Sequence, residues 1–215
     1  FFKGGCVMQF INHIVAGFHI TGAFMMWMIL IIALFTVGFC VERFWYLFVK
    51  CGTNRSSFMS GISKYIKAGD FEKAIKYASS VSTPLSKAVL AVLQNRGKGR
   101  KAASKAVDEV FLSEAPKITT RIPLISMFAN LATLMGLSAT VYGVMVDFDA
   151  IANVPVAQRA QALAAGIAIA LSGTLFGLLV AIPALFASGF LAAKADALVE
   201  EIDEKATKLM NLIEE

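Results

Sequence analysis

The chain has 215 residues, of which 57% are hydrophobic and 16% are charged. Its mean hydropathy of +0.68 is too high for an ordinary soluble domain, so the composition excludes that class and favours a membrane protein. The formal net charge of +5 is informative through its distribution, because 15 of the 20 Lys and Arg residues lie from Arg43 to Arg121.

The first residues predict a short helix at an interface. Residues 1–18 contain one charge, Lys3, and apolar side chains around Asn12, so we expect a helix that lies on the outer face of the membrane. His13 and His19 have no carboxylate or thiolate nearby in the sequence and are expected to be interfacial residues rather than ligands.

The first membrane span is predicted at residues 19–49. Residues 22–41 carry no charge, and they are followed by Glu42, Arg43 and three aromatic residues, which is typical of a membrane–water interface. The basic segment then places the following residues on the cytoplasmic side and the N-terminus outside, because positive charge is retained in the cytoplasm.

Residues 50–118 are expected to form a helical cytoplasmic domain. Gly69-Asp70 is typical of a helix end, and Ser82-Thr83-Pro84 of a helix start, because Ser and Thr cap free backbone amides and Pro is tolerated in the first turn. A helix from Ala102 is expected to run towards the second span, with Pro116 and Pro123 bending or interrupting it.

Two long uncharged runs predict a transmembrane hairpin. Residues 122–146 and 160–193 contain no Asp, Glu, Lys or Arg, and each exceeds the roughly 20 residues that cross a hydrocarbon core as a helix. The second span is therefore predicted at 119–148, an outer loop at 149–159, the third span at 160–193 and a charged cytoplasmic tail at 194–215. The expected fold class is an all-α membrane protein with three transmembrane helices, the second and third extended into the cytoplasm.

Small residues recur at spacings of three and four in both spans of the hairpin. Such stripes let two helix backbones approach closely in lipid, although small residues are also common in packed membrane helices generally. The positions expected to pack helices are Gly136, Gly143, Ala170, Gly177, Ala181 and Pro183, of which Pro183 is expected to introduce a kink.

Polar side chains follow the second span at intervals of seven residues, at Ser126, Thr133, Thr140 and Asp147. Hydroxyl groups within a membrane tend to face protein or water rather than lipid. The line therefore predicts a polar side of this helix.

The sequence does not predict an enzyme. Cys6, Cys40 and Cys51 are too scattered for a disulfide framework or a metal site. The chain shows no Ser/His, Cys/His or paired-carboxylate spacing that would build a catalytic site, and we expect no cofactor, no metal and no nucleic acid.

Several stretches resemble the MotA/TolQ/ExbB proton channel family. Residues 134–145, LMGLSATVYGVM, with Phe148 are similar to the family pattern LLGLLGTVxGMI…F, and residues 166–184 are similar to GIxxAL…TxxGLxxAIPA. Three spans with one long cytoplasmic segment resemble the TolQ/ExbB branch more than the four-span MotA branch. The sequence departs from the family at Ile169, where many relatives have glutamate, at Ala139, where glycine is usual, and at Thr133, near a usual proline.

The resemblance implies an ion-channel or stator subunit of a molecular motor in the bacterial inner membrane, driven by the proton or sodium motive force. It implies a homopentamer around a dimer of single-span ExbD/TolR/MotB-like subunits, whose membrane aspartate carries the ion. The N-terminus would be periplasmic and the C-terminus cytoplasmic. The residues agree with this scheme, because the uncharged runs 122–146 and 160–193 contain no carboxylate, so a strong proton-binding acid within the bilayer must come from a partner.

Hydroxyl groups are the expected ion pathway within this scheme. We expect Thr140 and Thr174 to face the partner aspartate and to solvate the ion or water beside it, with Thr133, Tyr142 and Ser172 as further candidates. The alternative is a structural membrane scaffold that gathers a partner without conducting ions. Threonines that face lipid or a sealed centre would favour the scaffold.

Overall fold

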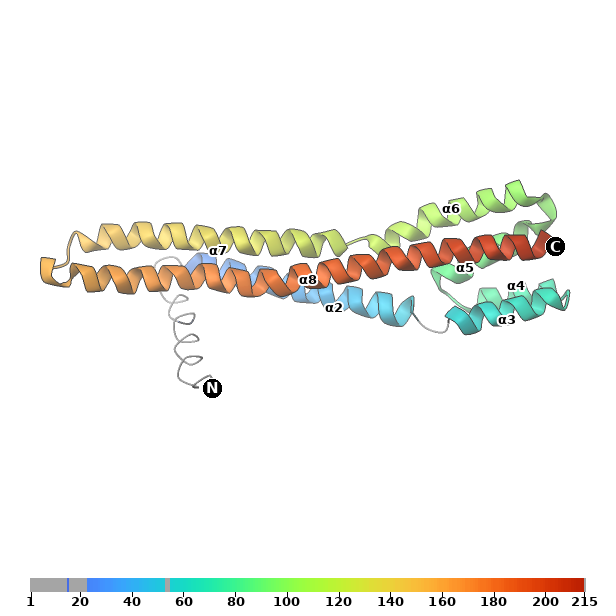
Figure 1. Ribbon diagram of the computed structural model, residues 1–215, viewed down its shortest axis with the longest axis horizontal. Coiled ribbons are helices and arrows are strands. Elements are labelled where there is room, and N and C mark those ends of the chain that lie inside the picture. The colour runs from blue at the N-terminus through green and yellow to red at the C-terminus, as the bar shows by residue number, and fades with distance from the viewer. Residues whose placement is uncertain (1–14, 16–22, 53–54, 215) are drawn as a thin grey trace. The chain divides into compact units, whose positions relative to one another are not determined.

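The computed structural model describes residue 15 and residues 23–52 and 55–214, and every regular element within these ranges is a helix. The expected interfacial helix at 1–18, apart from residue 15, lies outside the described residues, as do His13 and His19. The elements in chain order are α2 (Ala23–Trp45), the π-helix η1 (Tyr46–Lys50), α3 (Arg55–Lys67), α4 (Phe71–Ser80), α5 (Pro84–Asn95), η2 (Arg96–Lys98), α6 (Arg100–Thr119), α7 (Ile122–Ile151), η3 (Val156–Gln158) and α8 (Arg159–Glu214) (Figure 1).

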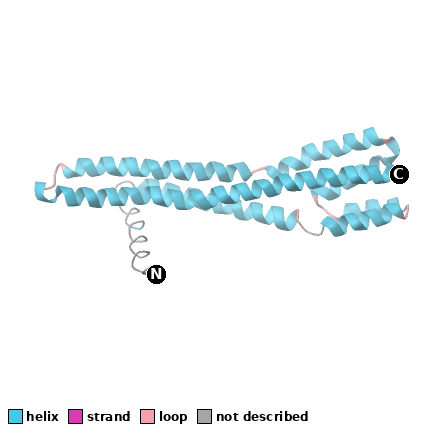
Figure 2. Cartoon of the chain, in the orientation of Figure 1, coloured by secondary structure: helices cyan, strands magenta, loops and turns pink. Residues whose placement is uncertain are grey.

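Within the described ranges, three helical stretches are long and apolar enough to cross a membrane, and α2, α7 and α8 supply most of their residues. Figure 2 shows these helices and the shorter ones joined by brief loops. The predicted all-α membrane fold is therefore confirmed. The chain divides into two compact units, which we name the apolar unit (Phe1–Cys40 with Pro123–Ser188) and the polar unit (Val41–Ile122 with Gly189–Glu215).

In the apolar unit α7 and α8 touch at the level of their backbones. A Cβ added to Gly177 would lie 2.6 Å from the carbonyl oxygen of Ala132 and 3.1 Å from the Cα of Gly136. Further along the hairpin, a Cβ on Gly143 would lie 2.9 Å from the Cβ of Ala170. Glycine is required at these positions because any side chain would force the two helices apart.

The third span continues past its proline. Pro183 lies inside α8, which runs unbroken from Arg159 to Glu214. Pro183 is exposed, whereas Ala181, two residues earlier, is buried. Pro183 therefore does not end the helix, and Ala181 is the residue of the two that lies in a packed interior.

Helix α2 completes the apolar unit by packing one side against the hairpin. Met26, Ile29 and Ile32 recur at a spacing of three and are buried. The rings of Phe35 and Phe39 stack on Phe128 of α7, with centroids 6.2 Å and 5.7 Å away.

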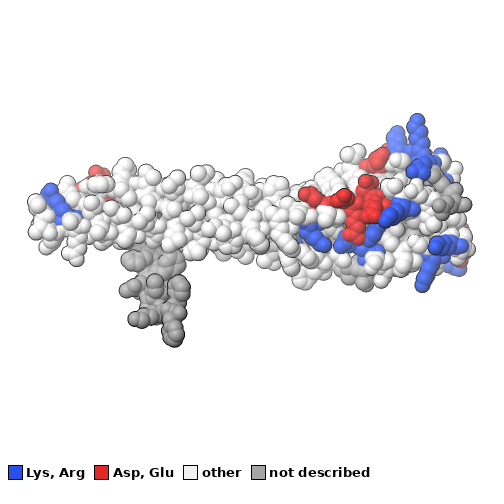
Figure 3. All heavy atoms as spheres, in the orientation of Figure 1, with Lys and Arg blue, Asp and Glu red and all other residues white. Residues whose placement is uncertain are grey.

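The outward face of the apolar unit carries large apolar side chains. Leu134, Val141 and Phe186 are among those that are more than half exposed. In Figure 3 most of the visible face of the hairpin is uncharged, and charged atoms appear where α7 and α8 are joined. Such a surface is suited to lipid or to another apolar chain rather than to water.

The end of α3 and the start of α5 fall where the sequence predicts them. Gly69 adopts a φ of 75° after α3, and the amide of Asp70 donates to the carbonyl of Tyr65 at 3.0 Å. At the start of α5 the hydroxyl of Thr83 accepts from the amide of Ser86 at 3.2 Å, and the amide of Thr83 donates to the hydroxyl of Ser86 at 3.0 Å. Both helix limits are thus fixed by local hydrogen bonds.

The interruption between α6 and α7 falls between the two prolines. Pro116 lies within α6, which continues to Thr119, and the helix stops at Thr120 and Arg121. Arg121 has a φ of 69°, a left-handed conformation that is costly for a side chain of this type. An ion pair from Arg121 Nη1 to Glu42 Oε1 at 2.5 Å accompanies this conformation.

The last part of α8 supplies an apolar stripe to the core of the polar unit. Its members recur every three or four residues, and all are buried. They are Leu191, Ala195, Leu198, Ile202, Ala206 and Leu209. The charged tail expected from the sequence is therefore also a core element, because its acidic and basic residues alternate with this stripe.

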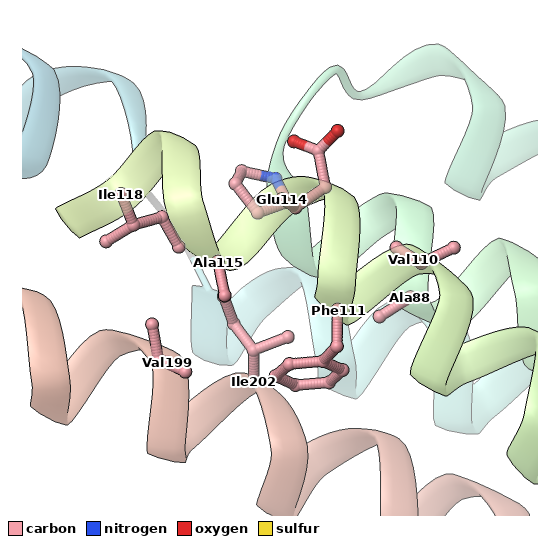
Figure 4. Close-up of a pocket in the computed structure, with 9 residues that line it drawn as sticks. Ala88, Val110, Phe111, Glu114, Ala115, Ile118, Val199 and Ile202 are labelled. Atoms are coloured by element: carbon pink, nitrogen blue, oxygen red, sulfur yellow. The ribbon is translucent and has the colours of Figure 1, made fainter. Parts of the chain in front are cut away.

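Glu114 is a buried carboxylate in the polar unit. Figure 4 shows it on α6, with its oxygens directed away from the side chains of Phe111 and Ile202. The Nζ atoms of Lys87 and Lys117 lie 2.8 Å and 2.7 Å from Glu114 Oε1. Burial raises the pKa of Glu114, but the hydrogen bonds from Lys117 and Lys87 outweigh burial and hold this pKa below its ordinary value.

The adjoining cavity of about 10 Å³ is at the lower limit for a single water, so it is no ligand site.

The glycine contact predicts that G177A destabilises the hairpin. The added methyl group would meet backbone atoms of α7, which cannot move independently, so we expect a loss of about 1–3 kcal/mol. The thermal unfolding midpoint of the purified protein measures this loss. G38A is the matched control, because a Cβ there would meet nothing within 4 Å. Equal midpoints for the two variants would show that the close contact is unimportant for stability.

The carboxylate bridge predicts that E114Q lowers the unfolding midpoint at neutral pH. The expected loss is roughly 0.5–1 kcal/mol, because both lysines are about half exposed and water screens the pair. E109Q, an exposed neighbour on the same helix, should have no effect.

The pH dependence of this loss follows from the lowered pKa of Glu114. The stabilisation is present above the ordinary carboxyl pKa and disappears as the pH falls through the lower folded-state pKa. The difference between the wild type and E114Q should therefore vanish at acidic pH. A difference that grows on acidification would contradict this assignment.

Candidate functional site

Two of the sequence-predicted hydroxyls meet across the hairpin. Thr140 of α7 and Thr174 of α8 form a direct hydrogen bond between their hydroxyl groups. The carbonyl oxygen of Gly136 accepts from Thr140 Oγ1 at 3.2 Å and from Thr174 Oγ1 at 3.0 Å. The close approach of the helices at Gly136 makes this possible, since a Cβ on Gly136 would lie 3.2 Å from the Cα of Thr174.

This cluster has more oxygen–oxygen contacts than hydroxyl protons that could form hydrogen bonds in them. Thr140, Thr174 and the Gly136 carbonyl make three contacts, whereas the two hydroxyls supply two protons. Two contacts at most are hydrogen bonds at any moment, so acceptor lone pairs remain. Both threonines are half-buried, and these lone pairs can accept from a water or a protonated acid or coordinate a cation.

The other predicted hydroxyls lie apart from this cluster. Thr133 donates to the Ala129 carbonyl at 3.2 Å, and the buried Ser172 donates to the Ile169 carbonyl at 2.6 Å, so each bonds to its own helix. Tyr142 is half-buried and two residues beyond Thr140, which places it about 200° around the helix from that threonine. The structure thus joins Thr140 and Thr174 and leaves Thr133, Tyr142 and Ser172 outside their contact.

The surroundings of the cluster are free of formal charge. Residues 122–146 and 160–193 contain no ionisable carboxylate, and Ile169 is a half-buried aliphatic residue. Among the described residues no group of three or more His, Cys, Asp or Glu side chains is placed to hold a metal ion. The arrangement can solvate an ion or a protonated group, but it supplies no strong acid or base of its own.

Sequence reasoning missed the carbonyl of Gly136. Glycine at position 136 suggested only close helix packing. Every residue has a backbone carbonyl, so the residue type does not show which carbonyl accepts a side-chain hydrogen bond. It also passed over Thr36 of α2, a buried hydroxyl that donates to the Ile32 carbonyl at 2.7 Å. The hydroxyl proton of Thr36 is used in this hydrogen bond within α2, so Thr36 is not part of the cluster.

Comparison with known proteins adds an independent finding. A putative biopolymer transport protein ExbB homolog from Methanothermobacter thermautotrophicus is 24% identical over 176 residues, which cover 81% of this chain and 62% of that protein. The Tol-Pal system protein TolQ of Haemophilus influenzae is 33% identical over 51% of this chain and 49% of its own length. TolQ of Pseudomonas aeruginosa is 32% identical over 45% of this chain and 41% of its own length.

The chain therefore spans about half the length of the curated relatives that it matches. The model of the MotA/TolQ/ExbB proton channel family matches residues 78–204, which is more than half of the chain. This range includes α7, the part of α8 up to residue 204 and the Thr140–Thr174 contact. The family is one of channel and transport subunits rather than an enzyme class, and with three apolar helices the chain is a multi-pass membrane protein. The chain belongs to the MotA/TolQ/ExbB proton channel family, and its relatives place it with ExbB and TolQ.

Proposed function

We propose that the chain is the ion-channel or stator subunit of an inner-membrane motor driven by the proton or sodium motive force. The observation that carries the proposal is the cluster of Thr140, Thr174 and the Gly136 carbonyl, which keeps free acceptor lone pairs within the uncharged runs of the hairpin. Membership of the proton channel family supports the same role.

The acid of this motor is supplied by a partner. A single-span ExbD/TolR/MotB-like subunit would bring a membrane aspartate, and the partner would be a dimer within a ring of five copies of this chain. The hairpin has no carboxylate in its apolar runs, so an aspartate from outside complements it. Thr140 and Thr174 solvate the ion or the protonated carboxyl group beside that aspartate.

The driving force is adequate for this mechanism. One charge that crosses a potential of 100 mV releases about 2.3 kcal/mol, which is several times the thermal energy. The N-terminus would be periplasmic and the C-terminus cytoplasmic, in keeping with the basic residues between Arg43 and Arg121.

The hydroxyl role predicts that T140V and T174V each reduce ion flux. Valine keeps the shape of threonine but cannot accept a hydrogen bond. Loss of one interaction with a charged group is expected to lower the flux by roughly tenfold or more. The measurement is proton or sodium flux in vesicles that contain the purified complex of this chain with its partner, with assembly checked by size-exclusion chromatography.

T36V is the matched control for this experiment. It makes the same substitution at a buried hydroxyl that bonds to its own helix, so flux and assembly should persist. T140S and T174S keep the hydroxyl and should retain flux. Full flux in both valine variants would refute the assigned role, and an intact wild-type complex without any flux would identify a scaffold instead.

A further inference from the structure

Asp147 occupies an unusual position at the loop end of the hairpin. It lies in α7 four residues before that helix ends, and its carboxylate fills the space that a side chain at Gly166 of α8 would take. The carboxylate is therefore folded into the groove between α7 and α8. The side chain is half-buried, unlike that of Asp149, which is exposed.

No basic side chain among the described residues pairs with Asp147. Arg159 is the basic residue of the α7–α8 connection, and it is engaged elsewhere. Its Nε donates to the carbonyl of Val154 at 2.9 Å, and Nη2 donates to that of Ala152 at 3.5 Å. The carboxylate of Asp147 thus forms no ion pair within 4.0 Å with any of the described residues.

A structural role for Asp147 is hard to support on energetic grounds. The C-terminal end of a helix carries partial negative charge on its free carbonyl groups, so a carboxylate in the last turns of α7 is disfavoured. Half-burial against a glycine adds a desolvation cost, and no hydrogen bond to the carboxylate is found in the described ranges. Both the carboxylate and the helix end would be stabilised by a cation.

Asp147 lies on the same line of α7 as the threonine cluster. It follows Thr140 by seven residues, which is about two turns or roughly 10 Å along the axis. Between the two positions the interior of the hairpin is closed, because Gly143 packs against Ala170. An ion passing from Asp147 to Thr140 would therefore follow the half-exposed edge of the groove, on which Thr133, Thr140 and Asp147 all lie.

We propose that Asp147, seated over Gly166, is a cation-collecting site that feeds the Thr140–Thr174 cluster from the loop side of the membrane. This inference rests on the proposed channel function. The site takes a monovalent cation, either a proton or Na⁺, and raises its local concentration at the entrance. It does so by electrostatic attraction, so it affects how readily the pathway fills and leaves the later transfer step unchanged.

The test measures flux through the reconstituted complex while H⁺ or Na⁺ activity is varied on the loop side. A unit charge about 7 Å from the ion in water changes its local concentration by about threefold. D147N is therefore expected to raise the activity required for half-maximal flux by about threefold and to leave the maximal flux unchanged. Inert choline chloride should raise this activity for the wild type and leave D147N unaffected, because salt screens the charge.

Two variants serve as controls. D147E keeps the charge and should restore part of the affinity, whereas D149N removes an exposed charge outside the groove and should behave as the wild type. T174V serves as the separate test of the channel function, because it should lower the maximal flux at any ion activity.

The outcomes separate the two proposals. If T174V lowers maximal flux while D147N matches the wild type at low ion activity, the collecting site is refuted and the channel function stands. If D147N lowers the maximal flux without changing the half-maximal activity, Asp147 does not collect ions. If neither variant changes any parameter, both proposals fail.

Discussion

The close approach of α7 and α8 is the constraint on which the apolar unit depends. Lipid gives two apolar helices no hydrophobic reason to associate, so dispersion contacts between small residues must hold them. Gly136, Gly143 and Gly177 permit contacts with the backbone itself. The two helices are antiparallel, so a move of about four residues towards the C-terminus of α7 corresponds to a move of three or four residues towards the N-terminus of α8. This single register gives three contacts: Gly136 with Gly177, Thr140 with Thr174, and Asp147 with Gly166.

Under the proposed function, this register also explains how the uncharged runs 122–146 and 160–193 serve a charged ligand. A carboxylate in the middle of the span would carry a large insertion cost, whereas a threonine can bond to its own or a neighbouring carbonyl until an ion arrives. The chain thus keeps a stable apolar helix pair and provides oxygen atoms at one level of it. In the proposed mechanism the acid resides on a separate chain.

The sequence predicts the helices better than it predicts their contacts. Charge-free runs identify the hairpin because the membrane excludes charge, and Thr83 marks the start of α5 because its cap is local. The pairing of Thr140 with Thr174 needs the register of two helices, and Ala170, Gly173 and Gly177 are equally small candidates for contact with α7. For this reason the sequence offered Thr133, Tyr142 and Ser172 beside the two threonines that meet.

Other features were present in the sequence but required the tertiary structure to interpret. The apolar stripe from Leu191 to Leu209 has clear helical spacing, yet its acidic neighbours suggested only a charged cytoplasmic tail. The helix break at Thr120 and Arg121 lies between two prolines, and either proline alone would have been a reasonable position for it. Where two local sequence features predict different structures, tertiary packing decides between them, and packing cannot be read from a single sequence.

The threonine cluster has three oxygen–oxygen contacts but only two hydroxyl protons, and this difference has a further consequence. Either hydroxyl can donate to the other while the second donates to the Gly136 carbonyl, so two such hydrogen-bond patterns are possible. A rotation of two hydroxyl groups, without any motion of the helices, exchanges one pattern for the other. The lone pair left open by the hydroxyl–hydroxyl bond can therefore be presented by α7 or by α8.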